Sequence, residues 1–318
     1  MNTAIKKVFS NRSAFLGLLI IILGFGLSFL SPYFFSISNL LEMTQFGAVL
    51  ALLGLGQTLV ITGGRGGIDL SVGSVLSFSG VMMALLYHAG LNMWPAAIIA
   101  IFIGGLLGSL NGFLVAVLNM PPLIVTLGTS YIFSSISLVI TNGVPVSGFP
   151  EWFSFIGHGK ILGIPAQVLF IVIPVFILMV WIIKHTTFGR SIYMVGVGDT
   201  AARLAGINVK KTRFMLYVAS GLLAGLGAIV MTSWLMAAKP DIGTGYDMQS
   251  ITVAVLGGTS MMGGEGSLSG TLLAVLIITM IYNGMQLANI TSVWQLAVMG
   301  IVLLCSIIAN NILESRSR

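Results

Sequence analysis

Long stretches without any charged residue are the feature that most constrains what this chain can fold into. From Gly266 to Leu313 the sequence contains no Asp, Glu, Lys or Arg. A bilayer core about 30 Å thick is crossed by roughly 20 apolar residues in a helix, so this stretch is long enough for two crossings. Only 7% of the 318 residues are charged, whereas an average soluble domain carries about 25%. The chain is therefore predicted to be a polytopic membrane protein. A cytosolic enzyme, a nucleic-acid-binding protein and a disordered protein are excluded.

The uncharged windows predict an all-α membrane protein in which about ten segments enter the bilayer. They are the segments 14–30, 44–62, 70–87, 94–118, 123–141, 164–183 and 214–236, a half-length helix at 248–258, and two helices within 266–313 that are separated by a break at Gln286–Ser292. We expect residues 1–318 to form a single transmembrane domain with one sizeable polar loop, at 184–213.

The basic residues indicate how the chain is oriented in the membrane. Counting the crossings places the following residues on one side: Lys6, Lys7, Arg12, Arg65, Lys184, Arg190, Arg203, Lys210, Lys211, Arg213, Arg316 and Arg318. Only Lys160 and Lys239 fall on the other side. Cytoplasmic loops carry an excess of Lys and Arg, so the larger group is predicted to be cytoplasmic, together with both termini. The net charge of +6 is thereby explained without a nucleic-acid partner.

Residue clusters that would support catalysis are absent from the sequence. His88, His158 and His185 are far apart, and Cys305 is the single cysteine. None of them has a partner at metal-ligand spacing, and no Gly-x-x-x-x-Gly-Lys-Ser/Thr loop for ATP phosphates occurs. The sequence therefore predicts no catalytic residue, no metal site and no cofactor, and a membrane-embedded enzyme is disfavoured.

Ion-coupled transport requires ionisable groups inside the membrane. The acidic residues closest to predicted segments all lie at segment ends; they are Glu42, Asp69, Asp241, Asp247 and Glu265. An ion-coupled secondary transporter is therefore the weaker alternative. A pathway with so few charges suits a neutral polar solute, and the driving force is expected to come from a partner that docks on loop 184–213.

Loop 184–213 is predicted to contain a short helix at about 199–205, because good helix formers follow Asp199. Asp199 is expected to cap this helix at its N-terminus, and Gly206 is expected to end it.

Two glycine-rich breaks suggest an internal repeat. Gly63–Gly67 precedes a small-residue helix at about 70–76, and 257–264 precedes another at 266–272. Paired interrupted segments in the two halves of a transporter point to its pathway. Asp69 and Glu265 are each expected to cap the helix that follows, and lining the pathway is the alternative role.

Glycines also recur at a spacing of four residues, at Gly104, Gly108 and Gly112 and again at Gly221 and Gly225. Glycine at this spacing lets two membrane helices approach closely. These positions are predicted to be packing faces and not binding sites.

Several motifs together resemble the membrane permeases of bacterial ATP-binding-cassette (ABC) monosaccharide importers, in the ribose permease-like family. They are Gly-Ile-Asp-Leu-Ser-Val-Gly-Ser at 67–74, Thr-Asn-Gly-x-Pro-Val at 141–146, Phe-Gly-Arg-x-Ile-Tyr at 188–193, Ala-Arg-Leu-x-Gly-Ile at 202–207, and Val-Leu-Gly-Gly-Thr-Ser-x-x-Gly-Gly-x-Gly at 255–266. The motifs occur in the same order along nearly the whole chain. The turn at 62–67 is about two residues longer than in the ribose-type permeases and carries Arg65.

The resemblance implies a permease of the bacterial inner membrane that forms the pathway for a neutral, ribose-like sugar by alternating access. It implies a second permease copy, usually giving a homodimer, a cytoplasmic ATPase that often has two fused cassettes, and an extracytoplasmic solute-binding protein. The coupling residues would be Asp199, Arg203, Leu204, Gly206 and Ile207. The pathway or gate residues would be Ile68, Asp69, Ser71, Gly257, Gly258, Gly263, Gly264 and Glu265. Permeases for autoinducer-2 share these motifs. A permease for another small solute, such as autoinducer-2 or a branched-chain amino acid, is the alternative.

Overall fold

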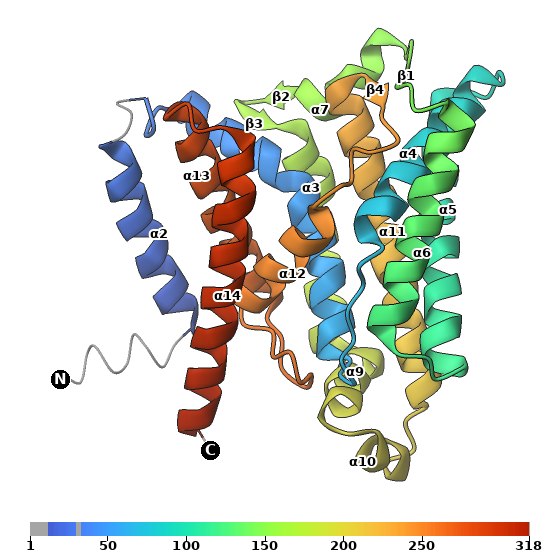
Figure 1. The fold of residues 1–318 in the computed structure, drawn as a ribbon, viewed down its shortest axis with the longest axis vertical. Helices are drawn as coiled ribbons and strands as arrows, with labels where there is room; N and C mark the ends of the chain where they lie inside the picture. The colour runs from blue at the N-terminus through green and yellow to red at the C-terminus, as the bar shows by residue number, and fades with distance from the viewer. Residues whose placement is uncertain (1–11, 30–32, 318) are drawn as a thin grey trace.

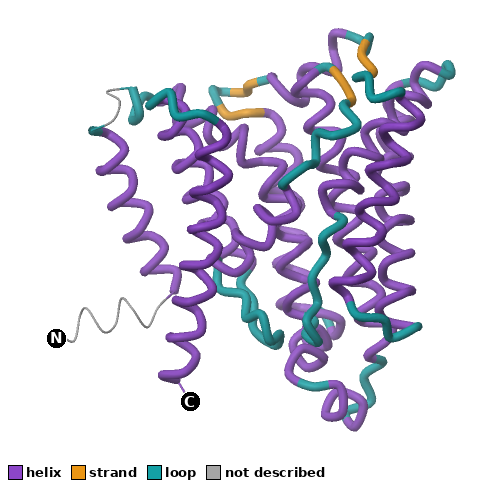
Figure 2. The backbone as a smooth tube through the Cα atoms, viewed as in Figure 1, coloured by secondary structure: helices purple, strands orange, loops and turns teal. Residues whose placement is uncertain are grey.

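The computed structural model describes residues 12–29 and 33–317, which form a bundle of long helices (Figures 1 and 2). Lys6, Lys7 and Arg318, which the topology prediction used, lie outside the described residues. The helices are α2 (Arg12–Ser28), α3 (Ile37–Thr62), α4 (Val72–His88), α5 (Met93–Gly112) continued by the π-helix η1 (Phe113–Val117), α6 (Pro122–Thr141), the π-helix η3 (Val168–Val172) continued by α8 (Ile173–His185), α9 (Thr187–Val197), α10 (Asp199–Leu204), α11 (Val209–Leu235), α12 (Tyr246–Leu256), α13 (Leu268–Leu287) and α14 (Ser292–Ser317).

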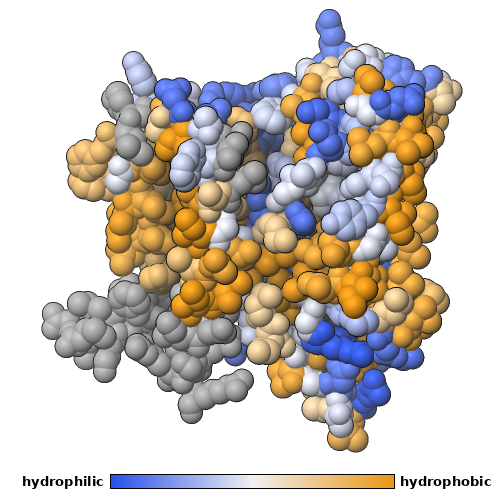
Figure 3. Space-filling model, in the orientation of Figure 1, coloured by the Kyte–Doolittle hydropathy of each residue, from blue (hydrophilic) through white to orange (hydrophobic). Residues whose placement is uncertain are grey.

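The prediction of an all-α membrane protein is confirmed in its main feature. Six of the described helices are long and apolar enough to cross a bilayer: Ile37–Thr62, Met93–Val117, Pro122–Thr141, Val168–His185, Val209–Leu235 and Leu268–Leu287. Ala14–Ser28 and Val72–His88 are shorter apolar helices. The visible surface carries a broad hydrophobic band between polar ends, as expected for a protein surrounded by lipid (Figure 3).

Hydrophilic side chains determine where several of the helices begin. The Ser36 hydroxyl accepts a hydrogen bond from the backbone N–H of Asn39 at the start of α3, at 3.3 Å. At the start of α11, the side-chain oxygen of Asn208 accepts a hydrogen bond of 3.0 Å from the backbone N–H of Lys211. Such caps satisfy backbone donors that have no partner inside the helix.

Helices α11 and α3 lie at the centre of the bundle. Glycines bring α5 against α11, since a Cβ added to Gly104 would lie 2.9 Å from the backbone N of Gly225. The predicted packing role of these glycines is thus confirmed. Asn39 of α3 and Asn283 of α13 exchange two amide hydrogen bonds, of 3.0 and 2.8 Å, which join these helices near one end.

The loop between α6 and η3 is folded into several short elements. It contains the strands β1 (Val146–Ser147), β2 (Lys160–Ile161) and β3 (Ile164–Pro165), the 3-10 helix η2 (Glu151–Phe153) and α7 (Ser154–His158). Strand β1 pairs antiparallel with β4 (Ala237–Ala238), and β2 pairs with β3. These elements cover the end of the bundle opposite α10 (Figure 1).

Two non-helical segments enter the bundle from opposite ends (Figure 2). Residues 63–71 lead from the α10 end up to α4, and residues 239–245 lead from the β4 end down to α12. They come together at the first turn of α4, where a Cβ on Gly73 would overlap the backbone oxygen of Gly243. Irregular backbone at membrane depth is tolerated only where protein or a water-filled cavity surrounds it.

Candidate functional site

A cavity of about 270 Å³ lies where these two segments meet, between α4, α6 and the α12 end of segment 239–245. Its lining residues are Leu70, Gly73, Ser74, Ser77, Ser130, Tyr131, Ser134, Leu138, Pro240, Asp241, Gly243, Thr244, Gly245 and Asp247. Broken helices that converge on a cavity near mid-membrane are typical of solute sites in transporters.

The lining of this cavity is rich in hydroxyl groups. Ser74 and Ser77 are contributed by α4, and Ser130 and Ser134 by α6. The Ser77 hydroxyl accepts a hydrogen bond of 2.9 Å from the backbone N–H of Gly243, which fixes the segment before α12 against α4. Serines three or four residues apart share one face of a helix, and this spacing is the signal that the sequence analysis missed.

Asp69 and Ser71, predicted to line a pathway or to cap a helix, lie outside this cavity in a buried hydrogen-bond network. The Asp69 carboxylate accepts hydrogen bonds from the Ser71 hydroxyl at 2.6 Å, the Ser71 N–H at 3.0 Å and the Ser220 hydroxyl at 2.9 Å. With its amide oriented to satisfy both partners, Gln57 of α3 pairs with the backbone N and O of Asp69, each at 3.2 Å.

This network continues into α5 and α6. Asn111 donates to the Ser71 hydroxyl at 2.7 Å and accepts from Thr129 at 2.7 Å. Ile68 takes part through its backbone oxygen, which accepts hydrogen bonds from Thr126 at 3.3 Å and Tyr217 at 3.4 Å.

The prediction that Asp69 caps α4 is wrong. The residue at the N-cap of α4 is Ser71, and it makes no side-chain capping bond. Asp69 instead fastens the segment before α4 to the surrounding helices, because its carboxylate is two residues too early to serve the first turn and turns toward Ser220.

The glycines predicted to form a pliable turn lie in two places. Gly257 packs on α13, where a Cβ would lie 2.5 Å from the backbone N of Thr271, and Gly258 follows with φ +111°. Gly263 and Gly264, with φ +87° and +78°, lie at the end of α3 instead, and Gly264 donates its N–H to the Thr62 oxygen at 2.9 Å.

The prediction that Glu265 caps α13 is also wrong. The cap is Ser267, whose hydroxyl accepts a hydrogen bond from the N–H of Gly270 at 3.0 Å. Glu265 is exposed. A serine directly before the helix is better placed to reach that donor than a side chain two residues earlier.

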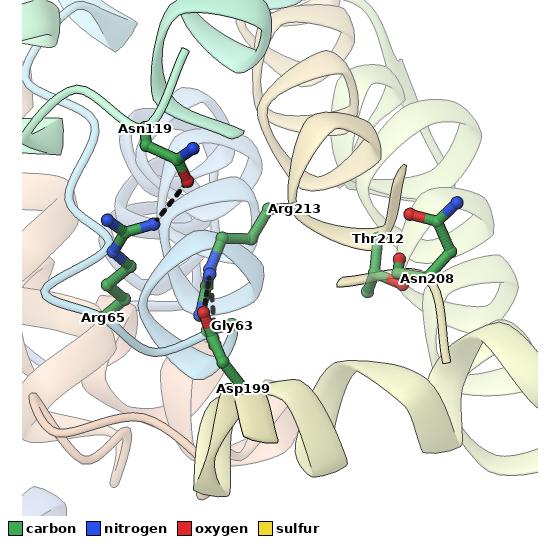
Figure 4. Close-up of polar contacts among 7 residues, drawn as sticks. All are labelled: Gly63, Arg65, Asn119, Asp199, Asn208, Thr212 and Arg213. Carbon is green, nitrogen blue, oxygen red and sulfur yellow. Dashed lines mark hydrogen bonds and ion pairs between the residues drawn. The ribbon is translucent and has the colours of Figure 1, made fainter. Parts of the chain in front are cut away.

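The short helix predicted in loop 184–213 is present as α10. Asp199 is not its cap, because α10 begins after Gly198 and has no side-chain capping bond. Asp199 instead forms a bidentate ion pair with Arg213 of α11, at 2.6 and 3.0 Å (Figure 4). The hydrogen bonds from Arg213, aided by its charge and those of Arg65 and Arg203, outweigh the effect of burial and hold the pKa of Asp199 below its ordinary value.

Of the other residues predicted to couple the permease to the ATPase, three are exposed and one is packed beneath α10. Arg203 and Leu204 are exposed on α10, and Leu204 is 86% exposed. Gly206, with φ +77°, ends the helix as predicted. Ile207 packs beneath α10 against Val195 and neighbouring apolar residues, so it supports the helix from within.

Two of the three histidines, His88 and His158, make structural hydrogen bonds at the β-strand end of the bundle. His88 contacts the backbone oxygen of Ser147 at 2.8 Å, and His158 contacts that of Trp234 at 2.7 Å. Within residues 12–29 and 33–317, no group of three His, Cys, Asp or Glu side chains could hold a metal ion.

The chain is similar along most of its length to known membrane permeases. The family described as branched-chain amino acid transport system / permease component matches residues 39–307. The chain is 38% identical to the ribose import permease protein of Escherichia coli K12 over 288 residues, covering 89% of each chain.

Two further relatives extend this similarity. The ribose import permease protein of Haemophilus influenzae is 36% identical over 319 residues, covering 99% of this chain and 97% of that protein. The D-allose transport system permease protein of E. coli K12 is 36% identical over 287 residues, covering 90% and 87%. No solved structure matches the chain.

Proposed function

The chain belongs to the branched-chain amino acid transport system / permease component family, and we propose from this membership that it forms the solute pathway of an ABC importer for a neutral monosaccharide. It is a multi-pass protein of the bacterial inner membrane and a transport subunit, not an enzyme. ATP hydrolysis takes place on a separate partner, and a solute-binding protein delivers the sugar from outside.

The observation that carries the proposal is the hydroxyl-rich cavity. Four serines from two helices face a volume of about 270 Å³ at which both non-helical segments end. Hydroxyl side chains both donate and accept hydrogen bonds, as sugar hydroxyls do. A cavity of this size is slightly below the usual range of small-ligand pockets, about 300–1,000 Å³, which suits a single sugar ring.

Charge distinguishes a sugar from an amino acid as the solute. The cavity lining includes the carboxylates of Asp241 and Asp247, and no Lys or Arg is among the lining residues. The carboxylate of an amino acid would find no Lys or Arg partner among these lining residues, and burying a carboxylate without such a partner costs free energy. Lys239 lies outside the lining and already pairs with Asp241, at 4.0 Å. Two of the similar proteins are permeases for ribose and D-allose, which favours the same solute class.

The docking surface for the ATPase is α10, which lies at the end of the bundle away from the β-strands (Figure 1). Leu204 and Arg203 are among its exposed side chains and would contact the ATPase directly. A second copy of the permease would complete the membrane core as a homodimer, and the ATPase would carry two fused cassettes.

Transport would proceed by alternating access. ATP binding would close the cassettes and move α10, and the two permease copies would rock so that the cavity opens outward. A topology of ten membrane segments with both termini cytoplasmic, as the sequence predicts, would put α10 on the ATP side. The two glycine-rich turns, which pack against each other at the α10 end, would be equivalent parts of a two-fold repeat.

Reconstitution tests the proposal. The permease, the ATPase and the binding protein encoded with it are placed in proteoliposomes, and uptake of labelled ribose and allose is measured with and without ATP. ATP-dependent uptake of either sugar supports the proposal. Uptake that requires a proton or sodium gradient but no ATP, or transport of leucine or autoinducer-2 in preference to both sugars, would overturn it.

A further inference from the structure

Arg213 joins α10 to the end of α3. Its guanidinium is buried, with 5% of the residue exposed, and it donates to both carboxylate oxygens of Asp199. The same group donates through two nitrogens to the backbone oxygen of Gly63, each at 3.3 Å (Figure 4). Gly63 is the C-cap of α3, where unpaired carbonyl groups favour a cation.

This arrangement depends on the shape of the arginine side chain. A guanidinium presents its N–H donors in a rigid planar fork, so Arg213 holds Asp199 and Gly63 at the same time. A lysine would bring one point charge and could not keep both contacts. Movement of α10 relative to α3 therefore has to break hydrogen bonds or carry the end of α3 with it.

A second connection lies beside Arg213, where three glycine-containing segments touch. We call it the glycine junction; it consists of Gly64 after α3, Gly196 near the end of α9, and Gly263 and Gly264 between α12 and α13. A Cβ on Gly64 would lie 2.7 Å from the Gly196 oxygen, and one on Gly196 would lie 2.7 Å from the Gly264 Cα. A Cβ on Gly263 would lie 2.8 Å from the Gly64 backbone N.

The neighbours of Gly64, Gly196 and Gly263 in the glycine junction are backbone atoms, which cannot rotate away as side chains do. Close-packed protein has low compressibility and transmits strain. Gly196 is joined to Asp199 by only two residues, so α10 is held both through the chain and through Arg213. On the far side, segment 63–71 leads to Leu70 and Ser74, which line the cavity.

We propose that Arg213 and the glycine junction transmit the movement of α10 to the segments before α4 and α13, and so couple the ATPase to the cavity. Arg213 is in this view a positioning residue that never contacts the solute. The inference rests on the proposed function, since it presupposes an ATPase that acts on α10.

The test measures solute uptake per ATP hydrolysed in proteoliposomes that contain the complete importer. Gly196→Ala inserts a methyl group into the glycine junction, and Arg213→Lys keeps the charge but loses the fork. Both variants are expected to assemble and hydrolyse ATP while uptake per ATP falls at least tenfold. A merely structural defect would lower assembly, hydrolysis and uptake together and leave this ratio unchanged.

Two matched controls are available in the same region. Gly198→Ala introduces a methyl group at an extended residue, φ 173°, whose added Cβ meets no atom within 4 Å. Arg190→Lys makes the same exchange at an exposed position on α9. Both are expected to retain the wild-type ratio.

The outcomes separate the two proposals. Wild-type uptake per ATP in Arg213→Lys, or in an assembled Gly196→Ala complex, would overturn the inference and leave the proposed function standing. If Gly196→Ala does not assemble, Arg213→Lys decides alone. A wild-type importer without ATP-dependent uptake would overturn the proposed function itself.

Discussion

The hydroxyl of Ser220 donates a 2.9 Å hydrogen bond to the carboxylate of Asp69 across 151 residues of sequence. Both residues are buried, with 1% of each exposed. Ser220 belongs to the central helix α11, whereas Asp69 lies in the non-helical segment before α4. This bond therefore fixes the segment that leads to the cavity against a largely buried central helix.

Replacing Ser220 by alanine should destabilise the protein. The substitution removes one of the donors to Asp69 and leaves a buried carboxylate oxygen without it, which costs about 1–3 kcal/mol. Thermal unfolding of the detergent-solubilised permease would measure this loss. Ser109→Ala is the control, because the Ser109 hydroxyl bonds only the Leu106 oxygen of its own helix. Equal melting temperatures for the two variants would contradict the role given to Ser220.

The ion pair between Asp199 and Arg213 predicts a defined pH dependence. Because the pKa of Asp199 is lowered in the folded protein, its contribution is fully present above the ordinary carboxyl value of about 3.9 and is lost as the pH falls through the lowered value. Hydrogen exchange of α10, corrected for intrinsic rates, should stay constant between about pH 8 and 5 and increase below about pH 4.

The same measurement on Asp199→Asn provides the comparison. This variant cannot lose a charge at position 199, so the change at low pH should disappear and α10 should exchange faster throughout. A transition near neutral pH in the wild type, absent in the variant, would be inconsistent with the lowered pKa.

Leu204 should carry much of the affinity for the ATPase. Burying a leucine side chain contributes about 1.5–3 kcal/mol, so Leu204→Ser should weaken association about 10- to 100-fold. Quantitative co-purification or surface plasmon resonance with the ATPase would measure the change. Leu162→Ser is the control, because Leu162 is 99% exposed in the β2–β3 turn, at the end away from α10. Equal weakening by both variants would argue against α10 as the docking surface.

Charge reversal on the same surface gives a separate prediction. Arg203 and Lys210 are exposed residues of loop 184–213, and the double variant Arg203→Glu, Lys210→Glu should abolish association with the ATPase while the permease still inserts. Membrane fractionation reports insertion and co-purification reports association. Undiminished co-purification of the double variant would refute this prediction.

The positions of the long apolar helices could be predicted from sequence because a single physical requirement, about 20 apolar residues for each crossing, determines them. Helix α9, whose 11 residues lie within the predicted polar loop 184–213, was not predicted, because this requirement does not apply to it. Even the short helix α12 and the turn after it were predicted, since glycine and polar residues interrupt the apolar pattern there. The capping roles of Asp69 and Glu265 were wrong for a different reason. Their spacing to the next helix is compatible with capping, and only tertiary structure reveals Ser220 as the partner of Asp69 or Ser267 as the actual cap.

The cavity could not be predicted from the sequence, because a serine in an apolar helix can have either of two roles. Its hydroxyl can bond a carbonyl in the preceding turn of its own helix, as Ser137 of α6 does with the Phe133 oxygen at 2.8 Å. Ser130 and Ser134 lie in the same apolar helix as Ser137, so the sequence does not distinguish their roles from its role. That they line a cavity together with Asp247 depends on the path of residues 239–245, which no local pattern specifies.

The serines of α6 therefore provide the most direct test of the cavity. Ser134→Leu would place an apolar side chain into a volume of about 270 Å³, and we expect ATP-dependent sugar uptake to fall at least tenfold. Ser130→Ala removes only a hydroxyl group. The loss of one hydrogen bond to the sugar, about 0.5–1.5 kcal/mol, corresponds to a two- to tenfold lower rate of uptake.

Ser135→Leu is the matched control, because Ser135 is the next residue on α6, is exposed and does not line the cavity. Association with the ATPase, measured in parallel, should be unchanged in all three variants. If Ser134→Leu and Ser135→Leu transport equally well, the solute passes elsewhere. If only Ser134→Leu is impaired while assembly is normal, the hydroxyl face of α6 lies on the sugar's route.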